Sequence, residues 1–211
     1  ISSRRKGPVS LITSITIGGV AVGVTALTVV TSVWNGFEAE FLDKLLGINA
    51  HAVVLRNHDV FRRYEEVAKT LEARDGIELA APFVYSEVIA QSARGGSGVA
   101  IKGIEPDSAA KTPLAKYVKE LSFDDLRASA TSTAPAGILI GRELQETLHV
   151  EKGDVISIIS PYGGDDGQPR SQPFTVVGVF HSGMYEFDAN LVFIDLREAQ
   201  AFFRLYRTVT G

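Results

Sequence analysis

The first hydrophobic segment of the chain is long and carries no charge. Asp, Glu, Lys and Arg are absent from Gly7 to Phe37, between the basic triplet at residues 4–6 and Glu38. An α-helix rises about 1.5 Å per residue, so roughly 20 apolar residues cross the hydrocarbon core of a bilayer. The pattern predicts a transmembrane helix over residues 8–36. The basic triplet places residues 1–7 on the cytoplasmic side.

The apolar positions keep a helical spacing beyond this segment. Phe37, Phe41 and Leu45 alternate with charged residues, so we expect the same helix to continue outside the membrane to about residue 47. Gly47 is a typical residue for its C-terminal cap. A signal peptide is the alternative, but its apolar region spans only about 7–15 residues. A retained anchor is therefore the better interpretation.

Residues 48–211 show shorter and mixed patterns. Strands are predicted at 51–55, 85–92, 99–104, 137–140, 155–160, 174–180 and 191–195, with a strand or extended segment at 77–82. Helices are predicted at 60–74, 142–149 and 196–205, short helices and loops at 105–128, and a surface linker at 129–135. Strands and helices do not alternate regularly, which favours an α+β domain.

Composition and motifs narrow the possible functions. The chain has 211 residues, a net charge of −4 and no cysteine, which argues against nucleic-acid binding and excludes a thiolate metal site. The four histidines (His51, His58, His149 and His181) lack the spacing of metal ligands, so no metal site is expected. A P-loop and a G-x-S-x-G elbow are both missing from the sequence. An enzyme is a minority interpretation, and nucleotide hydrolysis is expected on another polypeptide.

Small residues follow one face of the predicted transmembrane helix. They recur at steps of four and three, and a G-xxx-G pair adds a second notch: Ser14, Gly18, Ala21, Thr25, Thr28 and Ser32, with Gly19 and Gly23. In lipid, close backbone approach and hydroxyl hydrogen bonds drive helix association. We predict that this face packs against other membrane helices. The alternative is that small residues are simply common in membrane helices.

One loop is longer than a hairpin requires. Residues 161–173 (PYGGDDGQPRSQP) lie between two predicted strands, and long loops in compact domains are usually functional or disordered. Prolines stiffen such a loop and reduce the entropy lost on binding. We predict a partner-binding arm with Tyr162 and Arg170 as contacts, because Tyr and Arg are enriched at interfaces. An unordered surface loop is the alternative.

Several motifs resemble one family of membrane proteins. They are Gly18-Gly-Val-Ala-Val-Gly, Ser32-Val-Trp-Asn-Gly-Phe-Glu, Gly137-Ile-Leu-Ile-Gly-Arg-Glu-Leu, Lys152-Gly-Asp-Val, Phe174-Thr-Val-Val-Gly-Val-Phe and Phe187-Asp-Ala-Asn-Leu-Val-Phe-Ile. With them the chain resembles the N-terminal half of the lipoprotein-releasing ABC permeases, the LolC/LolE family. The resemblance implies one transmembrane helix followed by a MacB-like periplasmic core domain with two lobes over residues 48–211.

The resemblance also implies a transport function. In the family, two permease subunits and an ATPase dimer extract triacylated lipoproteins from the bacterial inner membrane and pass them to a periplasmic carrier. This chain would then be a non-catalytic permease subunit that binds no cofactor, with ATP and magnesium on the ATPase. The first helix would transmit ATP-driven motion to the periplasmic domain. A MacB-type efflux permease, an FtsX-like mechanotransmission permease and a single-span periplasmic sensor or chaperone remain alternatives.

Two sites follow from the resemblance. In LolC-type subunits a hairpin called the hook binds the carrier, whereas LolE-type subunits contact the lipoprotein, and the hook would comprise Pro161, Tyr162, Gly163, Gly164, Asp165, Asp166, Gly167, Gln168, Pro169, Arg170 and Pro173. Acyl chains need apolar walls near the outer leaflet, where we expect membrane lipid or lipoprotein to contact Val30, Val33, Trp34, Phe37 and Phe41. A place in the interfacial aromatic belt is the alternative for Trp34.

Overall fold

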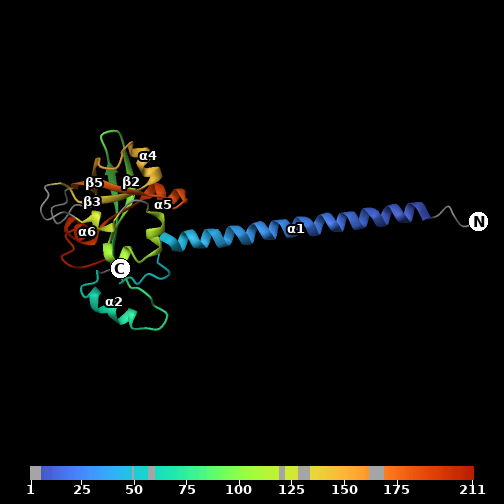
Figure 1. Ribbon diagram of the computed structural model, residues 1–211, viewed down its shortest axis with the longest axis horizontal. Coiled ribbons are helices and arrows are strands. Elements are labelled where there is room, and N and C mark those ends of the chain that lie inside the picture. Colours follow the sequence, from blue (N-terminus) through green and yellow to red (C-terminus); the bar gives the residue numbers. More distant parts are fainter. Residues whose placement is uncertain (1–5, 49, 57–59, 119–121, 128–133, 162–168) are drawn as a thin grey trace, which may run out of the picture. The chain divides into compact units, whose positions relative to one another are not determined.

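The computed structural model describes residues 6–48, 50–56, 60–118, 122–127, 134–161 and 169–211 (Figure 1). The chain forms two compact units, Ile1–Leu45 and Leu46–Gly211. The first unit is helical, and the second contains the strands and the shorter helices.

Helix α1 (Lys6–Ile48) is continuous, as the spacing of apolar residues predicts. Within the described residues it is the one helix that is long and apolar enough to span a membrane, with a mean hydropathy of 1.8 over its best window. Threonine hydroxyls along it donate to the carbonyl four residues earlier, for example Thr25 to Ala21 at 2.8 Å and Thr28 to Val24 at 2.9 Å. These bonds satisfy the hydroxyls inside the helix, so they add little polarity to its surface.

The helix ends at Ile48, one residue beyond the expected end, and Gly47 has a different function from the predicted cap. Gly47 lies inside the last helical turn. A Cβ atom at this position would overlap the ring of Tyr117, which ends the 3₁₀ helix η1 (Pro113–Tyr117). The close approach of the Tyr117 ring, and not a left-handed backbone, therefore favours glycine here.

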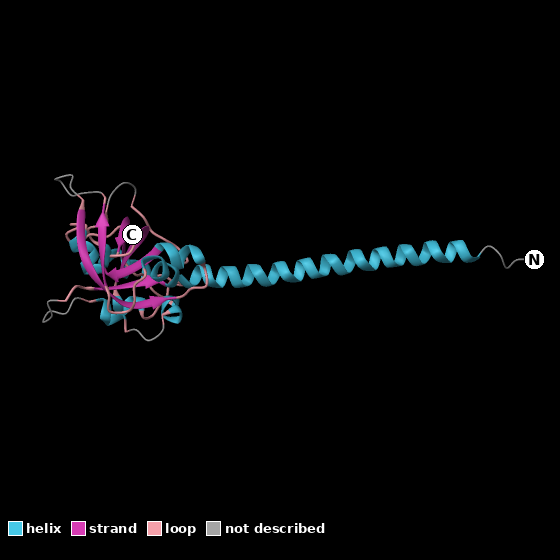
Figure 2. Cartoon of the chain, turned by 90° about the horizontal axis from the view of Figure 1, so that it is seen from above, coloured by secondary structure: helices cyan, strands magenta, loops and turns pink. Residues whose placement is uncertain are grey.

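The described strands of the second unit close into a barrel (Figure 2). They are β1 (Phe83–Gln91), β2 (Gly96–Ile104), β3 (Gly137–Gly141), β4 (Val155–Ser160), β5 (Arg170–Phe180) and β6 (Leu191–Asp195), in the spatial order β1-β2-β6-β3-β5-β4. The β2–β6 and β3–β5 pairs are parallel and the other pairs antiparallel. Closure leaves no open sheet edge along the barrel.

Short helices accompany the barrel, so the α+β class is confirmed. The described helices are α2 (Tyr64–Glu72), α3 (Pro106–Ala109), η2 (Phe123–Leu126), α4 (Arg142–Leu148), α5 (Tyr185–Asn190) and α6 (Leu196–Phe202), in addition to η1. Helix α4 directly follows β3 and buries Leu144 and Leu148 completely, as its spacing predicts.

Two apolar clusters fill the second unit. Successive side chains of a strand point to opposite faces, and β3 and β6 are buried along their whole lengths. Ile138 and Val192 belong to one cluster, whereas Leu139 and Phe193 belong to the other. Both faces of these strands are therefore covered, which explains their uninterrupted apolar sequences. Ile48, the last residue of α1, is buried in the second cluster.

Several predicted elements differ from the observed ones. The strand at 51–55 is wrong: this segment has no ladder, and Val53, Val54 and Leu55 are exposed. Strand propensity reflects packing against a neighbour, and the described residues provide no partner strand here. The segment at 77–82 also has no ladder. Helix α2 begins at residue 64 instead of 60, because Phe61 pairs with Val209 in an isolated bridge.

The C-terminal part of the chain differs from the prediction in two further places. Helix α5 was not predicted from the pattern, and α6 ends at Phe202 instead of residue 205. Helix α6 stops because Arg204 adopts a left-handed conformation, with φ of 53°, which ends a helical run. The predicted linker at 129–135 lies outside the described residues up to residue 133.

Asp188 organises the turn between β5 and β6. Its side chain, in α5, is nearly inaccessible, with 1% of its surface exposed. One carboxylate oxygen accepts from the amide and hydroxyl of Ser182 at 2.8 and 2.7 Å, and the other accepts from Nδ1 of His181 at 2.9 Å. The amide of Gly183 also donates to this second oxygen, at 3.3 Å. Asp188 therefore satisfies four donors, two from the buried Ser182 and one each from the exposed His181 and Gly183.

We expect Asp188→Ala to lower the free energy of unfolding of the core domain by about 2–4 kcal/mol, because it removes the carboxylate that pairs the amide and hydroxyl of the buried Ser182. Urea unfolding followed by circular dichroism measures this loss. Asp75→Ala removes an exposed carboxylate from the turn after α2 and serves as the control, with an expected change within about 0.5 kcal/mol. Equal midpoints for the two variants would contradict a central structural role of Asp188.

Candidate functional site

An aromatic face lies on the C-terminal half of α1. Val30, Trp34, Phe37 and Phe41 follow one another at steps of four, three and four, so they share one side of the helix. The ring centroids of Trp34 and Phe37 are 6.4 Å apart, and those of Phe37 and Phe41 are 5.8 Å apart in a stacked arrangement. Val33 lies one turn before Phe37. The structure thus brings together the residues that the sequence nominates for lipid contact.

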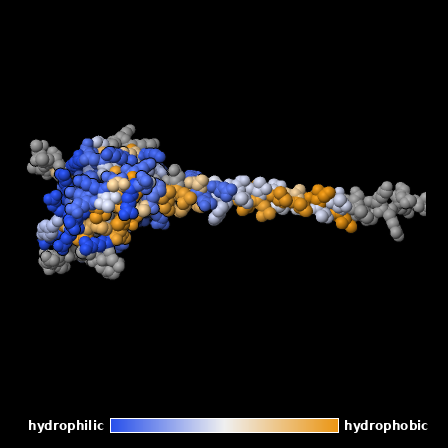
Figure 3. All heavy atoms as spheres, turned by 90° about the horizontal axis from the view of Figure 1, so that it is seen from below, coloured by the Kyte–Doolittle hydropathy of each residue, from blue (hydrophilic) through white to orange (hydrophobic). Residues whose placement is uncertain are grey.

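This face is apolar and accessible within α1. Trp34 is 64% exposed and Phe37 is 60% exposed, and Figure 3 shows orange apolar residues recurring along the helix. Burial of apolar surface yields about 25 cal/mol per Å². Aliphatic chains contacting this face would gain that energy without having to satisfy a polar group, which suits acyl chains or the apolar faces of other helices.

The small-residue face also lies on α1, and no contact within the described chain explains why its glycines are needed. A Cβ atom at Gly18, Gly19 or Gly23 would meet no atom of the described structure within 4 Å. Glycine inside a helix costs about 1 kcal/mol relative to alanine. Nothing within the described chain requires that cost, and the packing of this face against other membrane helices stays a prediction.

The predicted hook is a loop between paired strands. Its tip, residues 162–168, lies outside the described residues, so Tyr162 and the glycine-rich part cannot be placed. Its ends are described: Ser160 of β4 pairs with Arg170 of β5, and Ser157 pairs with Pro173. Pro161 and Pro169 therefore flank the loop where it leaves the ladder. The hairpin connection is confirmed, and the carrier-binding role stays a prediction.

The sequence predicts Arg170 in the loop, but in the structure it is the first residue of strand β5. It is partly buried, and its Nη1 donates to the carbonyl of Phe202 near the end of α6 at 3.2 Å. The C-terminal carbonyls of a helix carry partial negative charge, which favours a cation there. This contact attaches the base of the loop to α6. Whether Arg170 also contacts a partner stays a prediction.

A cluster of charged side chains around Arg127 supports the fold. The Arg127 guanidinium contacts Asp107 at 2.7 Å, Asp124 at 2.6 Å and Asp195 at 3.9 Å. The hydrogen bond that Arg127 donates to Asp107 raises the pKa of Arg127, and burial raises the pKa of Asp195. Asp195 also caps α6 by accepting from the amide of Arg197 at 2.6 Å. The cluster joins α3, η2 and α6, and within the described residues no group of His, Asp and Glu could hold a metal ion.

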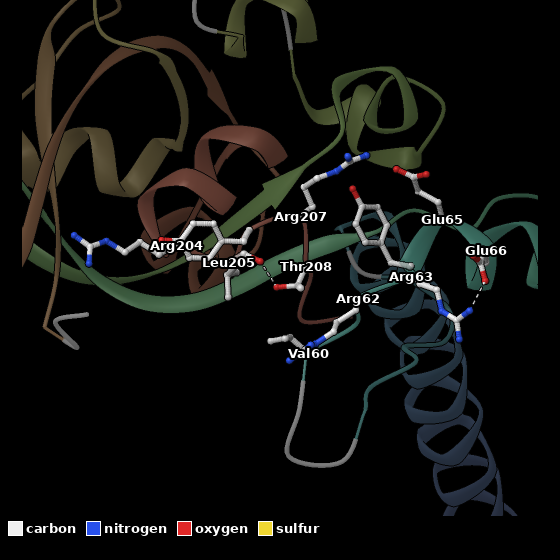
Figure 4. A pocket seen from close by; sticks show the side chains of 11 residues that line it. Val60, Arg62, Arg63, Glu65, Glu66, Arg204, Leu205, Arg207 and Thr208 are labelled. Atoms are coloured by element: carbon white, nitrogen blue, oxygen red, sulfur yellow. Dashed lines mark hydrogen bonds and ion pairs between the residues drawn. The ribbon is translucent and has the colours of Figure 1, made fainter. Parts of the chain in front are cut away.

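The core domain has a hollow of about 700 Å³ that the sequence does not predict. Figure 4 shows that its lining side chains come from two segments: Arg62, Arg63, Glu65 and Glu66 from the start of α2, and Arg204 and Arg207 from the turn after α6. The two segments are far apart in the sequence, so no local pattern joins them. The one sequence signal is the concentration of arginine in two short stretches of a net acidic chain.

Residues 13–210 match the family described as the MacB-like periplasmic core domain. The chain belongs to this family. Among curated relatives, the lipoprotein-releasing system transmembrane protein LolC of Neisseria meningitidis serogroup B is 33% identical, over 100% of this chain and 50% of that protein. LolE of Haemophilus influenzae is 26% identical, over 94% of this chain and 48% of that protein.

The chain spans about half the length of these relatives, so the predicted resemblance to the N-terminal half of LolC/LolE-type permeases is confirmed. Among solved structures, the extracellular domain of the noncanonic ABC-type transporter YknZ from Gram-positive bacteria aligns with a TM-score of 0.49. It is 16% identical over 73% of this chain and 72% of that one. The family match over residues 13–210 covers most of the apolar helix α1 as well as the core domain.

Proposed function

We propose that the chain is the N-terminal half of a permease subunit in an ABC transporter that extracts lipoproteins from the inner membrane. The observation that carries the proposal is the similarity to LolC over the whole chain, helix and core domain together. Its core domain would lie in the periplasm of a bacterium. A second permease subunit and an ATPase dimer would complete the transporter, and a periplasmic carrier would receive the triacylated lipoprotein.

In this function α1 would transmit motion between the membrane and the core domain. The helix is continuous to Ile48, and its last residues are held in the core domain: Ile48 is buried in the same apolar cluster as Leu114 and Phe123, and Gly47 packs against Tyr117. Interiors are close-packed and transmit small displacements. A shift of α1 driven by ATP hydrolysis on a separate subunit would therefore reach the η1 segment directly.

The small-residue face would hold α1 against the other helices of the transporter. Three glycines without an internal packing reason support this role. The aromatic face lies toward the other end of the helix, where it would contact acyl chains in the outer leaflet. One helix would thus combine a packing surface with an apolar wall, and the assignment of these residues is part of the proposal.

Photo-crosslinking tests the lipid wall. A photoreactive amino acid at Val30, Val33, Trp34 or Phe37 of the full-length permease should label a radiolabelled lipoprotein several-fold more strongly than one at Leu11. Leu11 is equally exposed, at 64%, but lies near the cytoplasmic end of the helix. Adducts with bulk phospholipid alone, or equal labelling from Leu11, would remove the proposed wall.

A MacB-type efflux permease is the second candidate, because the matched family is defined by the MacB-like core domain. The two functions differ in cargo, which is membrane-embedded for one and soluble for the other. Affinity purification of the full-length protein distinguishes their partners: a soluble periplasmic lipoprotein carrier supports lipoprotein release, and a periplasmic adaptor of an efflux channel supports the alternative.

A further inference from the structure

We propose that the hollow between the start of α2 and the turn at residues 204–208 is a docking site for an acidic polypeptide segment of a partner protein. This site, which we call the arginine hollow, lies entirely within the core domain and has no lining residue in common with the loop at 161–173. The proposal does not depend on the lipoprotein-release function.

The arginine hollow has more positive than negative side chains in its lining. Four arginines and two glutamates line the arginine hollow: Arg62, Arg63, Arg204, Arg207, Glu65 and Glu66. Arg63 approaches Glu66 at 3.6 Å, whereas Arg62, Arg204 and Arg207 make no ion pair with any described residue. The chain as a whole carries a net charge of −4. A local excess of unpaired cations on an acidic protein attracts acidic partners and not a second copy of the same surface.

The turn with Tyr206 and Arg207 at its centre has an unfavourable backbone conformation. Tyr206 and Arg207 have φ angles of 39° and 63°, in the left-handed region that non-glycine residues rarely adopt. The amide of Thr208 donates to the carbonyl of Leu205 at 2.9 Å and closes a turn with positive φ at both central residues. Such turns strongly favour Asn-Gly. Tyr206 and Arg207 occupy it instead, and unfavourable backbone conformations concentrate at functional sites.

The strained turn presents the side chains that dominate protein interfaces. Tyr206 is 83% exposed, and Arg207 is exposed beside it. Tyr and Arg are the residues most enriched among energetic hot spots. No described hydrogen bond of the Tyr206 side chain explains its position in this turn, so its value is expected in a contact with another molecule.

The shape and the two glutamates favour a polypeptide over a lipid surface. The arginine hollow is concave, about 700 Å³ in volume, and Leu205 and Val60 contribute apolar lining. An extended peptide can place carboxylates on the arginines and an apolar side chain in the hollow. A uniformly anionic membrane surface would instead meet Glu65 and Glu66, and like charges repel.

Fluorescence anisotropy of a short labelled peptide that alternates Glu with Leu tests the proposal on the full-length permease in detergent. We expect salt-sensitive binding that Arg62→Glu with Arg207→Glu weakens roughly tenfold or more. Arg94→Glu with Arg142→Glu is the matched control, with the same charge change on exposed residues of other elements, and should change the affinity less than about twofold. A peptide that alternates Lys with Leu should not bind.

A second variant separates binding from folding. Tyr206→Asn with Arg207→Gly gives the turn its preferred residues, so the thermal midpoint should rise by a few degrees while affinity for the acidic peptide falls. The proposal is overturned by absent binding of the acidic peptide, by unchanged affinity in the Arg62/Arg207 variant, or by arginine-dependent binding of phosphatidylglycerol vesicles in place of the peptide. A lower midpoint in the turn variant would refute the argument from strain.

Discussion

Replacing Gly141 by alanine is expected to lower the free energy of unfolding of the core domain by more than about 4 kcal/mol, and valine should prevent folding. Gly141 ends β3 immediately before α4, and a Cβ atom there would overlap the backbone of Asp188. Backbone atoms cannot move aside as a flexible side chain can. Asp188 is moreover fixed by its bonds to Ser182 and His181, so the overlap cannot be relieved locally.

The urea midpoint and the yield of folded protein measure this effect. Gly98→Ala is the matched control, because Gly98 also lies in a barrel strand but a Cβ atom there would meet nothing within 4 Å. This variant should keep or slightly raise the stability, since alanine reduces the entropy of the unfolded chain. A Gly141→Ala variant with the parental midpoint would show that β3 and the Asp188 turn do not approach as closely as described.

Deleting Gly163–Pro169 from the full-length permease is expected to abolish carrier capture and leave the transporter assembled. The deleted residues form most of the proposed hook, so the partner would lose its contact surface. The ladder between β4 and β5 extends to the Ser160–Arg170 pair without them, and the core domain should therefore fold normally. The effect on carrier affinity should be about 100-fold or more.

A pull-down with purified carrier measures the loss, and co-purification of the ATPase reports assembly. Replacing the same residues by a Gly-Ser segment of equal length should give the same loss, because the side chains and not the length are proposed to bind. A deletion of similar size at residues 129–133 controls for shortening a loop elsewhere. Parental carrier binding by the Gly163–Pro169 deletion would remove the hook from the proposed function.

Helix α1 and most barrel strands could be predicted from the sequence because their signals are local. An uncharged segment of this length has few structural alternatives, and the alternation of buried residues in β4 and β5 follows a period of two. The closed barrel could not be predicted, because it depends on pairs such as β2 with β6 that are distant in sequence. The strand predicted at 51–55 fails for the same reason: its residues suit a strand, but the described residues provide no partner.

The candidate sites also divide into those that depend on local sequence patterns and those that depend on residues distant in sequence. The aromatic and small-residue faces depend only on helical spacing, which the sequence shows directly. The prediction of Gly47 as a helix cap is wrong, because the residue that Gly47 contacts, Tyr117, is distant in sequence and no local pattern indicates it. The arginine hollow combines Arg62 with Arg207 and depends on left-handed conformations of Tyr206 and Arg207 that sequence preferences disfavour. A local rule broken without a structural gain is itself a sign of function, and it becomes visible only in the folded chain.

ATP-dependent release of a radiolabelled triacylated lipoprotein from proteoliposomes tests the proposed permease function most directly. The vesicles would contain the full-length protein, its partner permease and the ATPase, with the periplasmic carrier outside. We expect the lipoprotein to leave the membrane in a soluble complex with the carrier only when ATP and this permease are both present. Retention of the lipoprotein in the vesicles, with ATP-driven transport of a soluble efflux substrate instead, would contradict the proposed function.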